Sequence, residues 1–207
     1  SLPRILAVGL CGALVLASAD RSLGDGDFYV IPVANRNIRM PAHNTAIGID
    51  ALHSNTTGDY CTASGYEALY SNTEGSLNTA GGYHTLYSNT TGHTNTATGT
   101  SALRYNNTGY ENVASGAYAL FSNTDGYRNT ANGTYALYHN TIGYHNTASG
   151  ATALNRNIDG HHNTASGFQA LYLNTSGHSN TASGTYALRS STTGDYNTAA
   201  PRAYLPG

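Results

Sequence analysis

The chain has 207 residues, only 10% of them are charged, and its formal net charge is −2. Ordinary soluble domains contain roughly 25% charged residues, so most polar groups of this protein are uncharged. The sequence has no basic stripe that would neutralise phosphates, which argues against nucleic-acid binding.

Residues 1–19 have the layout of a secretory signal peptide. Arg4 precedes an apolar run from Ile5 to Leu16, and Ala17-Ser18-Ala19 follows as a small-residue cleavage site. The apolar run is shorter than the ~20 residues that a membrane-spanning helix needs. We therefore expect an exported protein, located outside the cell or on its surface.

A second interpretation keeps this segment in the mature protein. Large and small residues alternate in it, so that the large apolar ones would share one side of a strand: Leu6, Val8, Leu10, Leu14 and Leu16. Such an assembly segment could complete the sheet of a neighbouring copy by strand addition. An apolar helix in the core of a filament is the competing arrangement.

Residues 20–43 are predicted to form an amino-terminal cap. Phe28 to Ile31 is typical of a short strand that ends at Pro32, and Pro41 precedes the first repeat. Arrays of stacked repeats need atypical units at their ends.

Residues 44–200 repeat every 17 residues with the consensus G-x-x-A-L-x-x-N-T-x-G-x-x-N-T-A-x. The first glycine column runs from Gly48 to Gly184 and the second from Gly58 to Gly194, without an insertion or deletion. Helices are improbable because each unit holds two glycines and several Asn, Thr and Ser residues. The period predicts an all-β solenoid, a β-roll or β-helix of about nine coils, followed by a tail at 201–207.

Leucine and alanine are expected to form the core of the solenoid. Leucine is the one large apolar residue that never varies, and the alanine of N-T-A-x-G shares a strand face with asparagine. The predicted core residues are Leu52, Leu69, Leu86, Leu103, Leu120, Leu137, Leu154, Leu171, Leu188, Ala63, Ala97, Ala131 and Ala165.

Two asparagine columns lie beside the turns. The first runs from Asn55 to Asn174 and the second from Asn78 to Asn197. Asparagines stacked on successive coils can hydrogen-bond to one another along the stack. Glycine at the turns would permit positive φ.

The two cysteines are Cys11, within the apolar run, and Cys61, which takes an asparagine position. They could pair within or between chains, but the simpler interpretation is two small buried residues.

One leucine per coil makes a thin core, so we expect copies of the chain to cover each other's aromatic surface as a homo-oligomer or helical polymer. One aromatic column contains Tyr70, Tyr87, Phe121, Tyr138 and Tyr172, and another contains Tyr110, Tyr127 and Tyr144.

The segments GYEALYSNTEG (65–75) and NTASGTYALRSSTTG (180–194) resemble repeats of bacterial and phage tail-fibre-like proteins. More distantly, they resemble the heads of trimeric autotransporter adhesins. The resemblance covers residues 44–199 and implies a β-roll, surface exposure and an adhesive or fibrous role.

No catalytic constellation or phosphate-binding loop is present in the sequence, and we expect no enzyme activity and no cofactor. His145, His162 and His178 should lie near one another in stacked coils, but no cysteine or carboxylate column converges on them. They are interpreted as exposed ladder residues, with no metal site.

The sequence contains N-glycosylation motifs at Asn55, Asn89, Asn106, Asn132 and Asn174. Because Asn132 lies outside the asparagine columns, it should be the most exposed of them. A secreted glycoprotein is therefore one prediction.

These observations favour an extracellular structural subunit that self-associates into a fibre and has adhesive properties. The alternative is a discrete trimeric adhesin or tail-fibre head that binds a glycan or receptor, since aromatic columns can stack against sugars. A minor alternative is an ice-binding protein, because a threonine column forms a regular array that Val113 interrupts.

Overall fold

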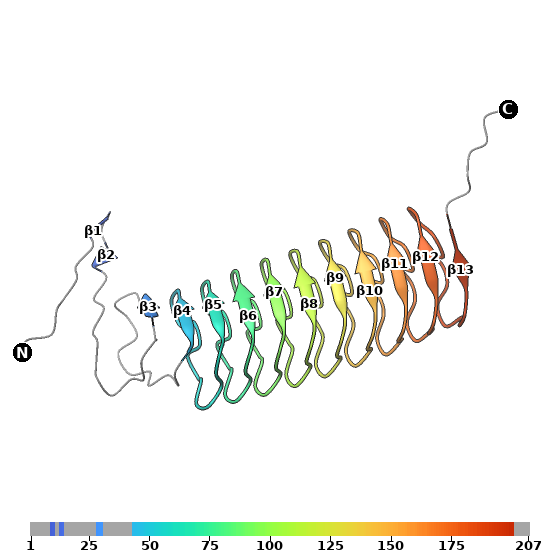
Figure 1. Ribbon diagram of the computed structural model, residues 1–207. Helices are drawn as coiled ribbons and strands as arrows, with labels where there is room; N and C mark the ends of the chain where they lie inside the picture. The colour runs from blue at the N-terminus through green and yellow to red at the C-terminus, as the bar shows by residue number, and fades with distance from the viewer. Residues whose placement is uncertain (1–8, 11–12, 15–27, 31–42, 201–207) are drawn as a thin grey trace, which may run out of the picture.

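The computed structural model describes residues 9–10, 13–14, 28–30 and 43–200. Within this part of the chain the fold is all-β and contains no helix. Each repeat forms one coil, and the coils stack in a single file with one strand from every coil at the same place (Figure 1). The β-solenoid that the period predicts is confirmed.

An 11-stranded parallel sheet runs along the stack in the order β3 to β13. Residues 17 apart face one another in the register, as Thr147 faces Thr164. The strands are β3 (Phe28–Val30), β4 (Thr45–Ile47), β5 (Thr62–Ser64), β6 (Thr79–Gly81), β7 (Thr96–Thr98), β8 (Val113–Ser115), β9 (Thr130–Asn132), β10 (Thr147–Ser149), β11 (Thr164–Ser166), β12 (Thr181–Ser183) and β13 (Thr198–Ala199).

The strand predicted before Pro32 is present as β3. It pairs in parallel with β4, so that Tyr29 faces Ala46, and it covers the amino-terminal edge of the first repeat strand. Apart from β3 and residue 43, the residues of the expected cap lie outside the described ranges.

The apolar amino-terminal segment is not one continuous strand. β1 (Gly9–Leu10) pairs antiparallel with β2 (Ala13–Leu14), and Leu10 faces Ala13. The prediction of a single strand with one bulky face is therefore wrong, because the chain reverses and pairs with itself. Leu6, Val8, Leu16 and the cleavage motif lie outside the described residues, as does the tail.

Leucine and alanine form the core as predicted. The leucines of the repeat column from Leu52 to Leu171, one per coil, are fully buried, and so are Ala63, Ala97, Ala131 and Ala165. Within each strand from β4 to β12 the alanine is buried, while the residues on either side of it are exposed or partly exposed. Leu188, in the last coil, is only partly buried and packs against this core.

Hydrogen bonds between coils extend well beyond the short strands. After each strand the backbone N–H groups donate first to the preceding coil and then to the following one: Glu67 N to Ile49 O at 2.9 Å, and Leu69 N to Thr85 O at 3.0 Å. The non-strand parts of a coil are thus stacked as regularly as the sheet, which satisfies backbone groups that would otherwise be buried without partners.

Three non-glycine columns adopt the left-handed conformation in every coil. In the fourth repeat they are Ser101 (φ 56°), Leu103 (φ 51°) and Glu111 (φ 54°). This conformation costs roughly 1–2 kcal/mol per L-residue, and each of these N–H groups donates to a neighbouring coil. The positive φ expected at turn glycines is present in the first glycine column, and these non-glycine residues adopt positive φ as well.

The two glycine columns serve different purposes. The first has φ between 117° and 144°, a region that L-residues rarely adopt. The second is not among the positive-φ residues, and it needs glycine because a Cβ at Gly143 would collide with Gly160 O and Asn140 Oδ1. Close stacking of coils, and not backbone conformation, excludes larger residues there.

Both asparagine columns form buried ladders, as predicted. In the first column Asn123 Nδ2 donates to Asn106 Oδ1 at 2.7 Å and to Gly126 O at 2.9 Å. In the second column the Oδ1 of each asparagine accepts the backbone N–H of the next, as Asn95 Oδ1 accepts from Asn112 N at 3.0 Å. The side chains thereby link adjacent coils as well as the two sides of each turn.

Cys61 is a free thiol and is fully buried. Its Sγ points at Gly75 O at 3.2 Å, the carbonyl that the asparagine of this column reaches in other coils. Burial raises the pKa of the Cys61 thiol. The interpretation as a small buried residue is confirmed for Cys61, while Cys11 lies outside the described residues.

Candidate interaction surfaces

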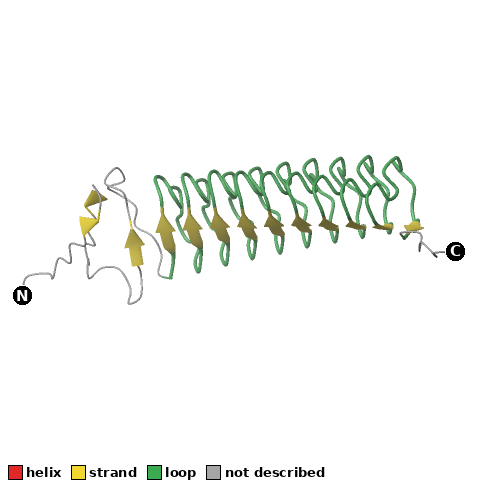
Figure 2. Ribbon diagram, turned by 90° about the horizontal axis from the view of Figure 1, so that it is seen from above, coloured by secondary structure: helices red, strands yellow, loops and turns green. Residues whose placement is uncertain are grey.

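The sheet presents a row of hydroxyl groups to solvent. Thr62, Thr96 and Thr147 lie in one exposed column, and the residues two positions later, such as Ser149, form a second. The array is interrupted at Val113, Gly81 and Asn132. Figure 2 shows that the strands turn progressively along the stack, so this surface is twisted and does not present one flat lattice, which weakens the ice-binding alternative.

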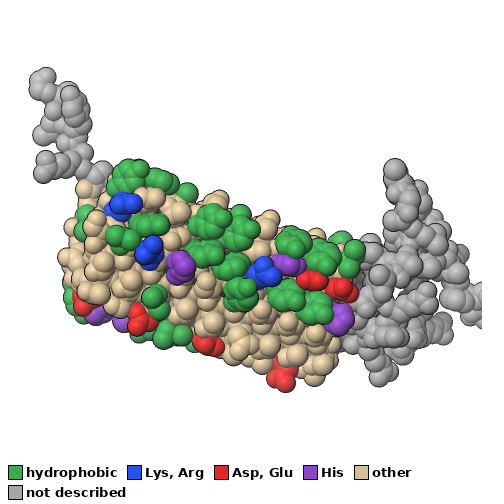
Figure 3. Space-filling model, turned by 180° about the vertical axis from the view of Figure 1, so that it is seen from behind, with side chains coloured by type: hydrophobic (Ala, Val, Ile, Leu, Met, Phe, Trp, Pro, Cys, Tyr) green, Lys and Arg blue, Asp and Glu red, His purple; other side chains and the backbone are tan. Residues whose placement is uncertain are grey.

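The opposite side of the solenoid is rich in aromatic residues. We define the aromatic face as the aromatic side chains of the turn between the first glycine and the first asparagine of each coil: Tyr66, Tyr70, Tyr83, Tyr87, Tyr105, Tyr118, Phe121, Tyr135, Tyr138, Phe168, Tyr172 and Tyr186. Hydrophobic side chains extend along this side, with a few charged and histidine side chains between them (Figure 3). Tyr83 and Tyr186 expose 50% and 54% of their surface.

Charged side chains on this face pack against the rings. Arg104 Cζ lies 5.6 Å from the ring centroid of Tyr87, and Arg189 Cζ lies 5.4 Å from that of Tyr172. Glu67 Oε2 and His84 Nε2 are 2.8 Å apart, and a hydrogen bond to Glu67 raises the pKa of the Tyr66 phenol. The face is thus mainly aromatic. Its arginine side chains lie over tyrosine rings, and Glu67 pairs with His84.

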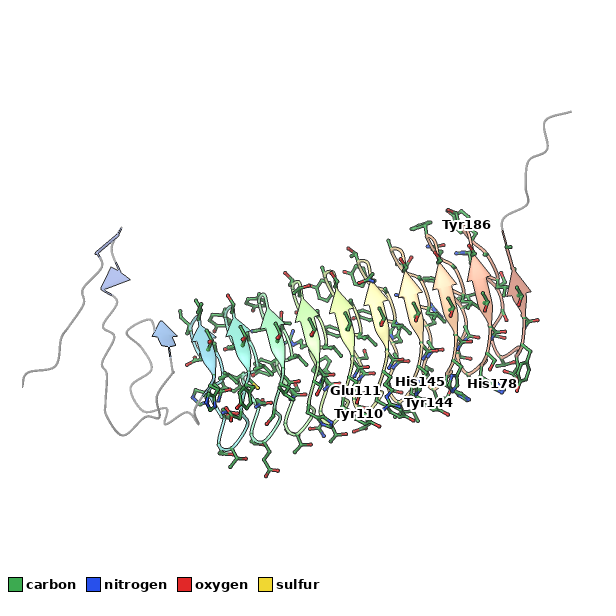
Figure 4. All side chains as sticks on the ribbon, viewed as in Figure 1. Tyr110, Glu111, Tyr144, His145, His178 and Tyr186 are labelled. Carbon is green, nitrogen blue, oxygen red and sulfur yellow. The ribbon has the colours of Figure 1, made fainter. Side chains whose placement is uncertain are left out.

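A second aromatic row follows the second glycine column. His93, Tyr110, Tyr127, Tyr144, His161 and His178 follow one another on successive coils, with ring centroids 4.7–5.1 Å apart. Figure 4 shows Tyr110, Tyr144 and His178 along the lower edge of the stack, well away from Tyr186 on the upper edge. We call these six residues the tyrosine–histidine row.

The stacking of these rings argues against one proposed use of them. Tyr127 lies between Tyr110 and Tyr144, and the ring planes differ by 7° and 2°. Both faces of an interior ring are therefore covered by its neighbours, and only ring edges face solvent. A sugar packs on the face of a ring, so the columns do not offer the stacking platforms that the carbohydrate-binding alternative needs.

Beside the row, Arg128 donates to Glu111 across adjacent coils at 2.6 Å, and this bond lowers the pKa of Glu111. His145 stacks on His162 with centroids 4.9 Å apart. Burial and the proximity of His162 lower the pKa of His145. In the described residues no group of three or more His, Cys, Asp or Glu side chains could hold a metal ion.

Four of the five predicted glycosylation sites are buried. Asn55, Asn89, Asn106 and Asn174 belong to the first asparagine column, and their Nδ2 atoms donate to glycine carbonyls inside the solenoid. This fold cannot accommodate a glycan on them, so the prediction is wrong at these positions. Asn132 is exposed, as expected, and stays a candidate.

No family model, curated protein or solved structure matches this chain. Within the part that the structure describes, no helix could cross a membrane.

Proposed function

We propose that the protein is a structural subunit of an extracellular fibre, built by association of copies along the aromatic face. The observation that carries the proposal is the aromatic face, half of whose residues are exposed. It lies on a side of the rod where hydrophobic side chains gather along the length (Figure 3). Exposed apolar patches of this extent mark interaction surfaces. Tyrosine and arginine are also the residue types enriched in protein–protein interfaces.

A second copy is the partner whose surface matches best. The aromatic face repeats with the spacing of the coils, about 4.8 Å, and any copy repeats with the same spacing. Ridges and grooves of two copies can therefore interdigitate over many coils. No partner of another period would match along the whole length.

The same periodicity favours a fibre over a closed pair. Shifting one copy by one or more coils replaces each contact with a similar one. A staggered pair therefore loses little interaction free energy compared with an aligned pair. The overhang then leaves part of each aromatic face free to recruit a further copy, and such open contacts propagate into filaments. A discrete trimeric head is the alternative, and it predicts a fixed stoichiometry.

The experiment combines sedimentation of the purified full chain over a concentration series with negative-stain electron microscopy. We expect concentration-dependent assembly into filaments of uniform width. Short uniform rods would favour the trimeric head, and a monomer at every concentration would contradict self-association.

A charge placed on the aromatic face should weaken assembly. Tyr83→Asp and Tyr135→Asp introduce carboxylates at exposed positions of that face, whereas the matched control Thr147→Asp places the same charge on the exposed side of β10. Assembly should be lost in the first two variants and retained in the control. Equal loss in all three would indicate a general effect of charge and contradict the proposed interface.

A further inference from the structure

Five pairs of tyrosines are stacked on adjacent coils, always 17 residues apart. Their ring centroids are 4.9–5.4 Å apart and their planes differ by at most 14°. The pairs are Tyr66 with Tyr83, Tyr70 with Tyr87, Tyr110 with Tyr127, Tyr118 with Tyr135, and Tyr127 with Tyr144.

These stacks bring together the atoms that react when tyrosine is oxidised. In two nearly parallel rings that project from equivalent positions of the repeat, matching carbon atoms are about as far apart as the centroids. Tyr110, Tyr127 and Tyr144 are only half-buried, with Tyr110 and Tyr144 at the lower edge of the stack (Figure 4), and both Tyr66 and Tyr83 are exposed. A one-electron oxidant in solution can therefore reach both members of a pair.

We propose that the stacked tyrosine pairs are sites of oxidative cross-linking, which joins neighbouring coils as dityrosine. Each phenol loses one electron and one proton to a peroxidase, and one hydrogen peroxide accepts both electrons and both protons to give two water molecules. The two phenoxyl radicals form a carbon–carbon bond between ring positions next to the oxygens. The hydrogen on each joined carbon then moves to the phenolic oxygen, which restores both aromatic rings.

The fold selects which tyrosines react with each other. Stacking holds the two radicals of a pair adjacent from the moment they form, and an intramolecular reaction between oriented groups is strongly favoured over a bimolecular one. Tyr196 is the most exposed tyrosine of the described residues, at 77%, but its ring contact is with His178. Pairing across coils, and not exposure, should therefore decide the products.

Such a link would be a covalent cross-link between two adjacent coils. It closes a chain segment of 17 residues between two coils, and a cross-link of this kind stabilises a fold by restricting its unfolded state. The only cysteine in the described ranges is buried, so it offers no ready disulfide there. The inference does not depend on fibre formation, because the link lies within one chain.

The test is to treat the dilute full chain with a peroxidase and hydrogen peroxide, and to map the products by mass spectrometry. We expect intramolecular links, each with the loss of two hydrogen atoms, between tyrosines 17 residues apart. The oxidised protein should also unfold at a higher temperature. Links distributed according to exposure, with Tyr196 dominating, would overturn the proposal.

Tyr127→Phe provides an internal control, since it removes one phenol and keeps the ring stack. The links from residue 127 to Tyr110 and Tyr144 should disappear, while the link between Tyr118 and Tyr135 persists in the same molecules. Circular dichroism of the variant checks its fold. Oxidation of the wild-type chain in denaturant should abolish the selectivity for pairs 17 residues apart, and an unchanged pattern there would also refute the proposal.

Discussion

Glycine occupies two columns of the repeat for two different physical reasons. The first glycine column needs a backbone conformation with φ above 100°. The second column needs space, because Gly143 lies against the carbonyl of Gly160 and the amide of its own coil's Asn140. At Gly81, in β6, neither constraint applies, since the nearest atom to an added Cβ is Thr98 Cγ2 at 3.6 Å.

Gly143→Ala should therefore destabilise the protein by about 3 kcal/mol, because the methyl group forces adjacent coils apart. The matched variant Gly81→Ala should be neutral or stabilising by about 0.5 kcal/mol, since it only restricts the unfolded chain. Denaturant unfolding monitored by circular dichroism measures both. Equal stabilities of the two variants would show that coils are not packed as closely as described.

At the scale of the coil, the asparagine ladders replace the side-chain packing that a thin core lacks. Asn112 Nδ2 donates to Gly126 O at 2.8 Å, and its Oδ1 accepts the backbone N–H of Asn129 at 3.0 Å. Both contacts are buried, so removing the amide leaves the Asn129 N–H without an acceptor, while Gly126 O keeps its bond from Asn123 Nδ2. A buried unsatisfied group costs about 1–3 kcal/mol.

Asn112→Ala should lower the free energy of unfolding by about 1–3 kcal/mol, since it leaves the buried backbone N–H of Asn129 without an acceptor. Amide hydrogen exchange should also quicken at Asn129, which loses its acceptor. Asn132→Ala is the control, because Asn132 is exposed and outside both columns; its effect should stay within about 0.5 kcal/mol. A mild effect of Asn112→Ala would mean that the ladder contributes little.

The repeat period, the buried leucine and alanine columns and the asparagine ladders could all be predicted from the sequence, because identical residues recur at one spacing. The left-handed conformations of Leu103 and Glu111 could not, since neither residue type favours positive φ. They arise from hydrogen bonds to neighbouring coils. At Asn55 the motif alone could not decide between a glycosylation site and a ladder position, because both have the same letters.

At the scale of the whole molecule, stability should depend on histidine protonation. Burial lowers the pKa of His139, and burial together with His162 lowers that of His145. The folded state therefore binds protons less readily than the unfolded state. The stability that these neutral side chains contribute is present above the ordinary histidine pKa of about 6.5 and is lost as the pH falls below it.

The unfolding temperature should accordingly fall as the pH is lowered through and below about 6.5. In the double variant His139→Gln, His145→Gln this fall should be smaller, because neither glutamine takes up a proton. Differential scanning calorimetry across the pH range measures the difference. Identical pH profiles for the two proteins would show that these histidines are not linked to folding.

Each 17-residue repeat adds one rung to a continuous parallel stack. Spin labels on the exposed threonine column test it directly, in a background in which Cys11 and Cys61 are replaced by Ser and Asn. Between Thr62 and Thr130, four rungs apart in the register, pulsed electron paramagnetic resonance should give a separation of about 19 Å. Between Thr62 and Thr181, seven rungs apart, the distance should be about 34 Å. Narrow distance distributions whose means grow in proportion to the number of rungs are expected for this stack. Broad distributions, or mean distances that do not scale with the repeat number, would contradict it.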